Sequence, residues 1–229
     1  MALTVVSIAT NHGTSSAVIS KPAGKWTDGN LLICFAAADI PVSGTLGVPA
    51  AFTSLGADTD GETISGWRVC SSEPSSYTLP MASGSADSYS GFIIELSGQD
   101  ATTPINKNSK KAGNSKTASF TAITTTVDGC LILACVGDSA GASTITFATP
   151  TGFTDQGGDQ SSTGADSFST ATRGSTETQT SAGAITPSSI SITDGATAAN
   201  NFWGTAVIAI APGAIPPSST PRSFGFAYA

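Results

Sequence analysis

The sequence predicts an all-β protein built from two tandem antiparallel β-sandwich units of the jelly-roll or immunoglobulin-like kind. Three observations predict it: a polar composition with few charges, short apolar runs between turn-forming residues, and an internal repeat. Charged residues make up 11% of the chain, against about a quarter in ordinary soluble proteins. Helical proteins usually cover their exposed faces with Glu and Lys, whereas Thr, Ser and Gly suit sheet surfaces and turns.

The first strand signals come before residue 40. "LTVVSIA" (3–9) and "SSAVIS" (15–20) mix β-branched with small residues, which is typical of strands. Asp28-Gly29 then turns the chain into "NLLICFAAA" (30–38). This run is short and apolar at nearly every position, so we predict a strand buried on both faces.

Further strands follow up to residue 98. Asp60-Gly61 is a strong hairpin signal between "AAFTSLG" and "ETISGWRVC". "SYTLPMA" is the next short strand, and "SYSGFIIELSG" (88–98) is the second strongly apolar one. The first half therefore holds about six or seven strands, as expected of a sandwich.

The second half repeats this order at an offset near 100 residues. "DGCLILACVGD" answers "DGNLLICFAAAD", "TGFTDQGGD" answers "AAFTSLGAD", and "FWGTAVIAIAPG" answers "SGFIIELSG". "SFSTATR", ending in Arg173, answers "ISGWRV" with its Arg68. A consistent register of strands and turns indicates an internal duplication, because biased composition produces only single matches.

The repeat defines the predicted domains. We expect a first β-sandwich repeat over 1–105, a second over 106–212, and an extended arm over 213–229. The boundary lies in a polar, turn-rich segment, 98–115. The sequence leaves open whether the two units are separate sandwiches or share one core.

The arm is rich in proline and ends in aromatic residues. Proline disfavours any central strand, so this segment is predicted to be extended and outside a sheet. Phe224, Phe226 and Tyr228 alternate as in a strand. Two interpretations stay open: a loose terminus, or a docking arm in which these three aromatics bind a neighbouring subunit.

The net charge of −7 argues against nucleic-acid binding, since an acidic surface repels phosphate. Four lysines do cluster near the boundary, and we favour a solvated linker there over a phosphate or acidic-partner site. They are Lys107, Lys110, Lys111 and Lys116.

Neither a signal peptide nor a membrane span is expected. The start "MALTVVSIATNH" has no basic segment, and the apolar runs are too short to cross a bilayer as helices. We therefore expect synthesis in a cytoplasm and no membrane partner.

The four cysteines are predicted to be buried free thiols. Cys34, Cys130 and Cys135 lie inside apolar runs, without the CxxC spacing or nearby histidine of a metal site. The sequence thus indicates no cofactor.

No catalytic constellation is visible. His12 is the single histidine, in a predicted surface loop, and no nucleophile or acid is marked out as its partner. A glycosidase would need two opposed carboxylates, and nothing in the spacing of the acids selects a pair. Trp26, Trp67 and Trp203 could form a sugar-stacking platform, but Trp67 and Trp203 lie in strand-like runs, which favours packing in the core or on a sheet face.

The sequence contains one candidate metal site. Asp58, Asp60 and Glu62 alternate in "GADTDGET", and alternating oxygens can bind calcium. The hairpin turn at Asp60-Gly61 already explains these residues, and the further ligands of an EF-hand loop are missing. We therefore assign no metal ligand, with a calcium loop as the alternative.

Several motifs resemble a family of tailed-phage structural proteins. "DGNLL", an aromatic-plus-Thr turn, "EPSSYT" and "SGQDATTPI" occur here in the family's order, over residues 14–213. Glu73-Pro74 with Tyr77-Thr78 carries one match, and Gly98 with Asp100 and Pro104-Ile105 carries the other. The sequence departs at Leu96-Ser97, where the family more often has an aromatic residue.

The resemblance implies a non-enzymatic virion component made of β-sandwich units. Within that class we expect a capsid decoration, or cement, protein that binds the major capsid protein or other virion proteins. Oligomerisation is expected from this role, with a trimer as the working guess, and the location would be the virion. The alternatives are a tail or fibre component that binds host-surface glycan and a polysaccharide-degrading enzyme.

Overall fold

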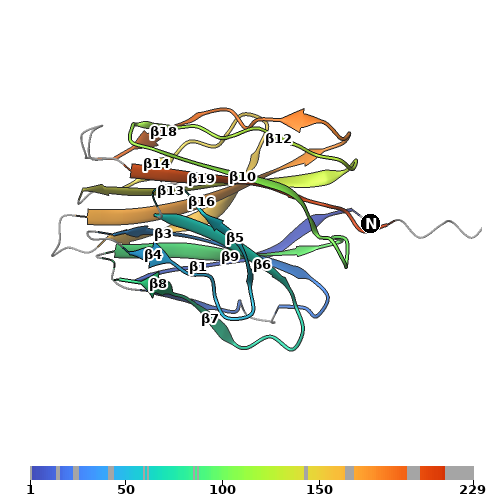
Figure 1. Cartoon of the computed structure of the whole chain (residues 1–229), viewed down its shortest axis with the longest axis horizontal. Coiled ribbons are helices and arrows are strands. Elements are labelled where there is room, and N and C mark those ends of the chain that lie inside the picture. The colour runs from blue at the N-terminus through green and yellow to red at the C-terminus, as the bar shows by residue number, and fades with distance from the viewer. Residues whose placement is uncertain are drawn as a thin grey trace, which may run out of the picture.

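Every regular element that the structure describes is a β-strand (Figure 1). The computed structural model describes residues 2–13, 16–22, 26–40, 44–58, 60, 62–84, 86, 88–141, 144–162, 168–194 and 202–214. The predicted all-β antiparallel class and its two similar halves are confirmed. In these residues, no helix is long and apolar enough to span a membrane. The predicted arm, apart from its first two residues, lies outside them.

Each half forms one five-stranded antiparallel sheet, and the strand order is equivalent in the two halves. The first sheet runs in the order β1 (Thr4–Gly13), β9 (Ser88–Ser97), β3 (Leu31–Asp39), β6 (Thr63–Val69) and β5 (Thr53–Ala57). The second runs in the order β10 (Ile105–Gly113), β19 (Phe202–Ile210), β13 (Cys130–Gly141), β16 (Phe168–Gln179) and β15 (Thr154–Ser162). The predicted duplication is therefore present at the level of individual strands.

Short strands cover the outer face of each sheet, which gives the four layers visible in Figure 1. Over the first sheet lie β2 (Ala17–Ser20) with β7 (Ser76–Leu79), and β4 (Thr45–Leu46) with β8 (Met81–Ser83). Over the second lie β11 (Thr117–Ala118), β18 (Ile190–Thr193) and β14 (Thr146–Phe147), and the pair β12 (Ile123–Thr124) and β17 (Ala184–Ile185). Each half is thus a sandwich with one large and one fragmented sheet.

Strand β3 is buried on both faces, as predicted. Side chains alternate along a strand, so Leu32 and Cys34 enter the outer apolar cluster of the first half. Ile33 and Phe35 point the other way, into a second cluster that contains residues of both halves. Because both faces are apolar, the run carries no polar alternation in the sequence.

The two large sheets pack face to face through one shared apolar layer. This finding resolves the question that the sequence left open. Each half contributes six buried residues at equivalent positions of the paired strands. They are Leu31, Ile33, Phe35, Phe92, Ile94 and Leu96 from the first half, and Leu131, Leu133, Cys135, Ala206, Ile208 and Ile210 from the second.

Strands β3 and β13 lie opposite each other in this layer, with equivalent residues in register. A Cβ on Gly137 would lie 2.6 Å from the Cβ of Ala37, so the backbones approach closely there. Farther along, Ser139 Oγ donates a hydrogen bond of 3.1 Å to Asp39 Oδ1. Residues 100 positions apart therefore meet, as equivalent residues do near the axis of a two-fold dimer.

The solvated linker expected around the lysines is wrong for most of its length. Residues Ile105–Gly113 form β10, the edge strand that corresponds to β1. Lys107 and Lys111 are exposed, whereas Lys110 is partly buried and its Nζ donates to the carbonyl of Leu55. Lysine is typical of protected edge strands, but without apolar alternation it gives no strand signal in the sequence.

The shared layer predicts that the two halves unfold together. Leu133→Ala opens a cavity in a fully buried position, so we expect it to lower the free energy of unfolding by about 2–5 kcal/mol. The control Val18→Ala, at a side chain that is 45% exposed, is expected to change it by less than about 0.5 kcal/mol. Urea titration followed by circular dichroism and tryptophan fluorescence measures both. Two separate transitions, only one of which moves in Leu133→Ala, would contradict the shared layer.

Candidate functional site

The predicted partner-binding aromatics lie outside the described residues. Phe224, Phe226 and Tyr228 follow Ala214, the last residue that the structure describes. Nearby, Gly213 N–H donates a hydrogen bond of 2.7 Å to the Gly98 carbonyl. The chain therefore leaves the described region beside the connection between its two halves.

A mostly apolar hollow of about 650 Å³ lies at this exit point. It is lined by residues from the N-terminal segment, the turn before β13, the end of β16 and the last described residues. These are Ala2, Leu3, Asp128, Gly129, Thr178, Thr180, Pro212 and Gly213. Among the described surfaces, this hollow combines apolar lining with proximity to the arm.

The recurring Asp-Gly turns have the same structural role in both halves. Asp28 Oδ1 accepts the N–H of Ser72 at 2.8 Å, and Asp128 Oδ1 accepts the N–H of Ala182 at 2.7 Å. Asp28 thus links the turn before β3 to the turn after β6, and Asp128 links the turn before β13 to the turn after β16. Turn chemistry, which the sequence indicated, accounts for both aspartates.

The other motif residues behind the family resemblance also hold turns and core contacts. Glu73 Oε1 accepts the N–H of Ser71 at 2.7 Å and lies 3.0 Å from Arg68 Nη2. The Arg68 guanidinium lies 5.9 Å from the ring centre of Tyr77, and that ring stacks on Trp26 at 5.2 Å. Arg68 thereby connects the "EPSSYT" turn to the outer apolar cluster.

Asp100 closes the turn that leads into β10. Its Oδ1 accepts the backbone N–H groups of Thr103 and Thr102 at 2.8 and 2.9 Å. These hydrogen bonds, with help from the two threonine hydroxyls, lower the pKa of Asp100 to about 2. This aspartate of the "SGQDATTPI" motif therefore stabilises a turn.

The geometry around Asp58 favours the hairpin interpretation over a calcium loop. Asp58 Oδ2 accepts the hydroxyl of Thr63 at 2.6 Å and its N–H at 3.1 Å, and Oδ1 accepts the N–H of Glu62 at 3.1 Å. Burial, together with the negative charges of Asp58, Asp39 and Asp60, raises the pKa of Glu62 to about 7. In the described part of the chain, no three acidic, histidine or cysteine side chains are arranged to hold a metal ion.

Asp138 is a buried carboxylic acid near the ion pair between Lys116 Nζ and Asp194 Oδ1, which lie 2.5 Å apart. It is 1% exposed, and its oxygens have no hydrogen-bond partner among the described residues. Burial is the main reason that the pKa of Asp138 is raised to about 8; the negative charges of Asp194 and Glu62 contribute to this rise, and the positive charge of Lys116 opposes it. At neutral pH the group is therefore mainly protonated. In the sequence Asp138 only ends the repeated phrase "DGCLILACVGD", and its structural counterpart in the first half is Ala38.

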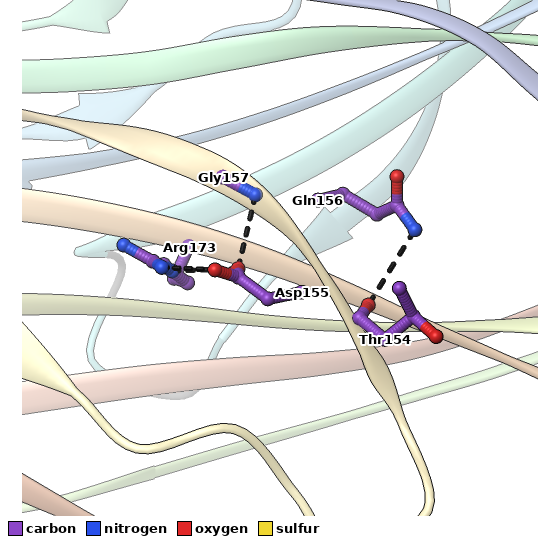
Figure 2. A network of polar contacts seen from close by, with 5 residues as sticks. All are labelled: Thr154, Asp155, Gln156, Gly157 and Arg173. Carbon is purple, nitrogen blue, oxygen red and sulfur yellow. Dashed lines mark hydrogen bonds and ion pairs between the residues drawn. The ribbon is translucent and has the colours of Figure 1, made fainter.

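An ion pair fixes a β-bulge on the edge strand β15 (Figure 2). Arg173 Nε donates to Asp155 Oδ1 at 2.7 Å, Nη2 donates to Oδ2, and Gly157 N–H donates to Oδ1 at 3.0 Å. Burial raises the pKa of Asp155, but the bonds from Arg173 and Gly157 and the Arg173 charge outweigh it and lower the pKa. Gly157 has a φ of 99°, a conformation that favours glycine.

The first half has a bulge at the corresponding place. There Gly56 N–H donates to Ser54 Oγ at 2.9 Å, and Gly56 has a φ of 92°. The predicted match between "AAFTSLGAD" and "TGFTDQGGD" thus holds, with serine in place of aspartate. The predicted match of Arg173 to Arg68 is wrong, because the strand register places Arg173 opposite Val136 and makes it equivalent to Ile64.

The remaining candidates of the sequence mostly pack in the core. Cys34, Cys70, Cys130 and Cys135 are buried free thiols, as predicted, and burial raises the pKa of Cys34 and of Cys70 to about 12. Trp26 and Trp203 are 2% and 5% exposed, and Trp67 packs against the shared layer. His12 is exposed at the end of β1 rather than in a loop.

A polar groove of about 560 Å³ runs between the two halves, where β1 lies over β15. Its lining includes hydroxyl, amide and carboxylate groups from β15 and β16. The lining residues are Thr4, Val5, Leu131, Gly152, Thr154, Gln156, Thr176, Glu177 and Thr178. None of the three tryptophans belongs to it.

Comparisons with protein-family models, with curated proteins and with solved structures each found no match.

The buried Asp138 predicts a loss of stability as pH rises toward about 8. The carboxyl group ionises near its ordinary pKa of 3.8 in the unfolded chain but near 8 in the folded protein. Its burial costs nothing while both states are protonated. Stability falls as pH rises from about 4 to about 8, where only the unfolded chain is ionised, and levels off above that range. Between pH 5 and 9 we expect Asp138→Asn to lose less thermal stability than the wild type, by at least about 3 °C in the unfolding midpoint. Scanning calorimetry measures this, with Glu177→Gln as control; parallel curves for wild type and Asp138→Asn would refute it.

Proposed function

We propose that this protein is a non-enzymatic virion structural component, a decoration or cement protein on the outer capsid shell of a tailed phage. The observation that carries the proposal is that the motif residues of the family resemblance hold turns and core contacts. Asp28, Glu73 and Asp100 each bind backbone N–H groups of a turn. Such residues specify a rigid shape, as a protein that clamps an assembly requires.

The partner we propose is the major capsid protein or another virion protein. Strand addition suits this partner, since edge strands such as β15 offer unpaired backbone groups. The net charge of −7 disfavours nucleic acid as the partner. Binding to a shell would also favour the folded, docked state by mass action. A homo-oligomer, with a trimer as the working assumption, belongs to the same proposal.

The polar groove supports one alternative function, glycan binding by a tail or fibre component. Thr154, Gln156 and Glu177 supply groups that can hydrogen-bond sugar hydroxyls. With two tryptophans buried in the cores, a sugar would have to be bound here without tryptophan stacking. A polysaccharide-degrading enzyme is a third candidate function. It would require turnover of a polysaccharide that a single Asp or Glu replacement abolishes.

Copy number and position in the particle separate these functions. Quantitative electron microscopy of intact particles is expected to show a fixed, high copy number on the capsid surface. Particles that lack the protein are expected to lose DNA at a lower temperature than wild-type particles. A few copies at the tail, with saturable glycan binding, would support the alternative and refute the cement role.

The arm is expected to contribute to docking. Deletion of residues 223–229 removes all three terminal aromatics but none of the described residues, so the sheets should fold unchanged. We expect reduced occupancy on particles, measured by quantitative mass spectrometry after competition with full-length protein. A Phe224→Leu/Phe226→Leu/Tyr228→Leu variant is the matched control of equal length. Unchanged occupancy of the truncated protein would remove the arm from the mechanism.

A further inference from the structure

Four hydroxyl groups lie buried between β9 and β16, beyond the apolar part of the shared layer. They belong to Ser88 and Ser90 of β9 and to Thr170 and Thr172 of β16, and each residue is at most 2% exposed. None of the four hydroxyl oxygens has a hydrogen-bond partner among the described residues. We refer to these four residues as the hydroxyl cluster.

The strand register places the hydroxyls of the two halves opposite one another. A Cβ on Gly174 of β16 would lie 3.0 Å from Phe92 Cζ of β9, so these strands face each other across the shared layer. Ser90 and Thr172 occupy the next positions on the same faces, because side chains alternate along a strand. Ser88 and Thr170 follow them toward the end marked by the Asp39–Ser139 hydrogen bond.

At the equivalent place between β6 and β19, a buried hydroxyl does have a hydrogen-bond partner. There Thr63 also lies at the inter-sheet face, and its hydroxyl donates to Asp58 Oδ2 at 2.6 Å. Gly204 of β19 makes room, since a Cβ on it would lie 2.0 Å from that carboxylate oxygen. On this side a carboxylate satisfies the hydroxyl. On the side of the hydroxyl cluster, none of the described carboxylates bonds to the four hydroxyls.

A buried hydroxyl without a partner is unfavourable, and nearly all such groups in native proteins bind another protein group or an ordered water. Four of them on two facing strands form a neutral, polar surface in which each group can donate and accept. Water matches this surface because one molecule can bind several hydroxyls at once. An apolar guest would leave the hydroxyls unpaired. The four residues are uncharged, and the carboxylate of Asp39, which pairs with Ser88 in the strand register, accepts a hydrogen bond from Ser139 Oγ.

We infer that the hydroxyl cluster is an internal hydration site, in which ordered water molecules bridge β9 of the first half to β16 of the second. The water would take the role that the Asp58 carboxylate has on the other side. It would thus belong to the joint between the two halves.

A crystal structure of the full chain at about 1.5 Å resolution tests the inference directly. The expected result is a water molecule within about 2.6–3.2 Å of at least one hydroxyl from each strand. A protein side chain lying between the four residues, or direct hydrogen bonds among the hydroxyls, would overturn it.

Isosteric substitution gives an independent readout. Thr172→Val keeps the shape but removes one partner of the water, so we expect a lower midpoint of thermal unfolding. Thr178→Val, an exposed residue on the same strand, is the matched control and is expected to change it little. A higher midpoint for Thr172→Val would overturn the inference, because removal of a dry, unpaired hydroxyl is stabilising. If Thr172→Val does not fold, Ser90→Ala tests the opposite strand in the same way.

Discussion

The packing of β3 against β13 is the contact on which the rest of the structure depends. Without it, each five-stranded sheet would expose an apolar face containing residues such as Ile33 or Leu133 to water. The outer strands cannot cover that face, since they already cover the opposite one. The duplication supplies the cover, because a second copy of the same sheet brings a second apolar face. The two repeats are therefore separate in sequence but joined in one fold.

The two copies have diverged where they meet. In a symmetric dimer, a residue near the axis meets its own copy, so two large side chains would collide. Here Phe35 and Phe92 of the first half correspond to Cys135 and Ala206 of the second. Gly174 gives further room beside the Phe92 ring. Because the two copies are joined in one chain, their faces can differ, and the bulky side chains of one face lie opposite the small ones of the other.

Much of this fold could be predicted from sequence because its central strands are buried on both sides. The apolar runs around Leu31 and Leu131 and the preceding Asp-Gly turns gave both the strand class and the duplication. Strand β10 was not predicted because it lies at a sheet edge, where lysines are tolerated and no pattern of alternating apolar residues is required. Equating Arg173 with Arg68 failed since residue identity is a poor guide to register in a chain rich in Ser and Thr.

The candidate sites also differ in whether local sequence or tertiary packing produces them. Turn-capping by Asp28 and Asp100 is local, so short motifs reveal it. The environment of Asp138 and the grouping of Ser90 with Thr172 are products of tertiary packing between distant segments. In a sequence where hydroxyl residues are common, nothing local marks those that become enclosed.

The lysine-bearing edge has a consequence for how the molecule meets its surroundings. Strands β1 and β10 occupy equivalent positions, yet β1 contains neither lysine nor arginine, whereas β10 contains Lys107, Lys110 and Lys111. The charge of the protein is therefore not symmetric, although its fold is nearly so: the β10 edge carries lysines, the equivalent β1 edge carries none, and the chain as a whole is acidic. A long-range torque of this kind orients a protein before any surface touches. The charge difference between the β1 and β10 edges thereby distinguishes two sides of the protein that the duplicated fold alone would make alike.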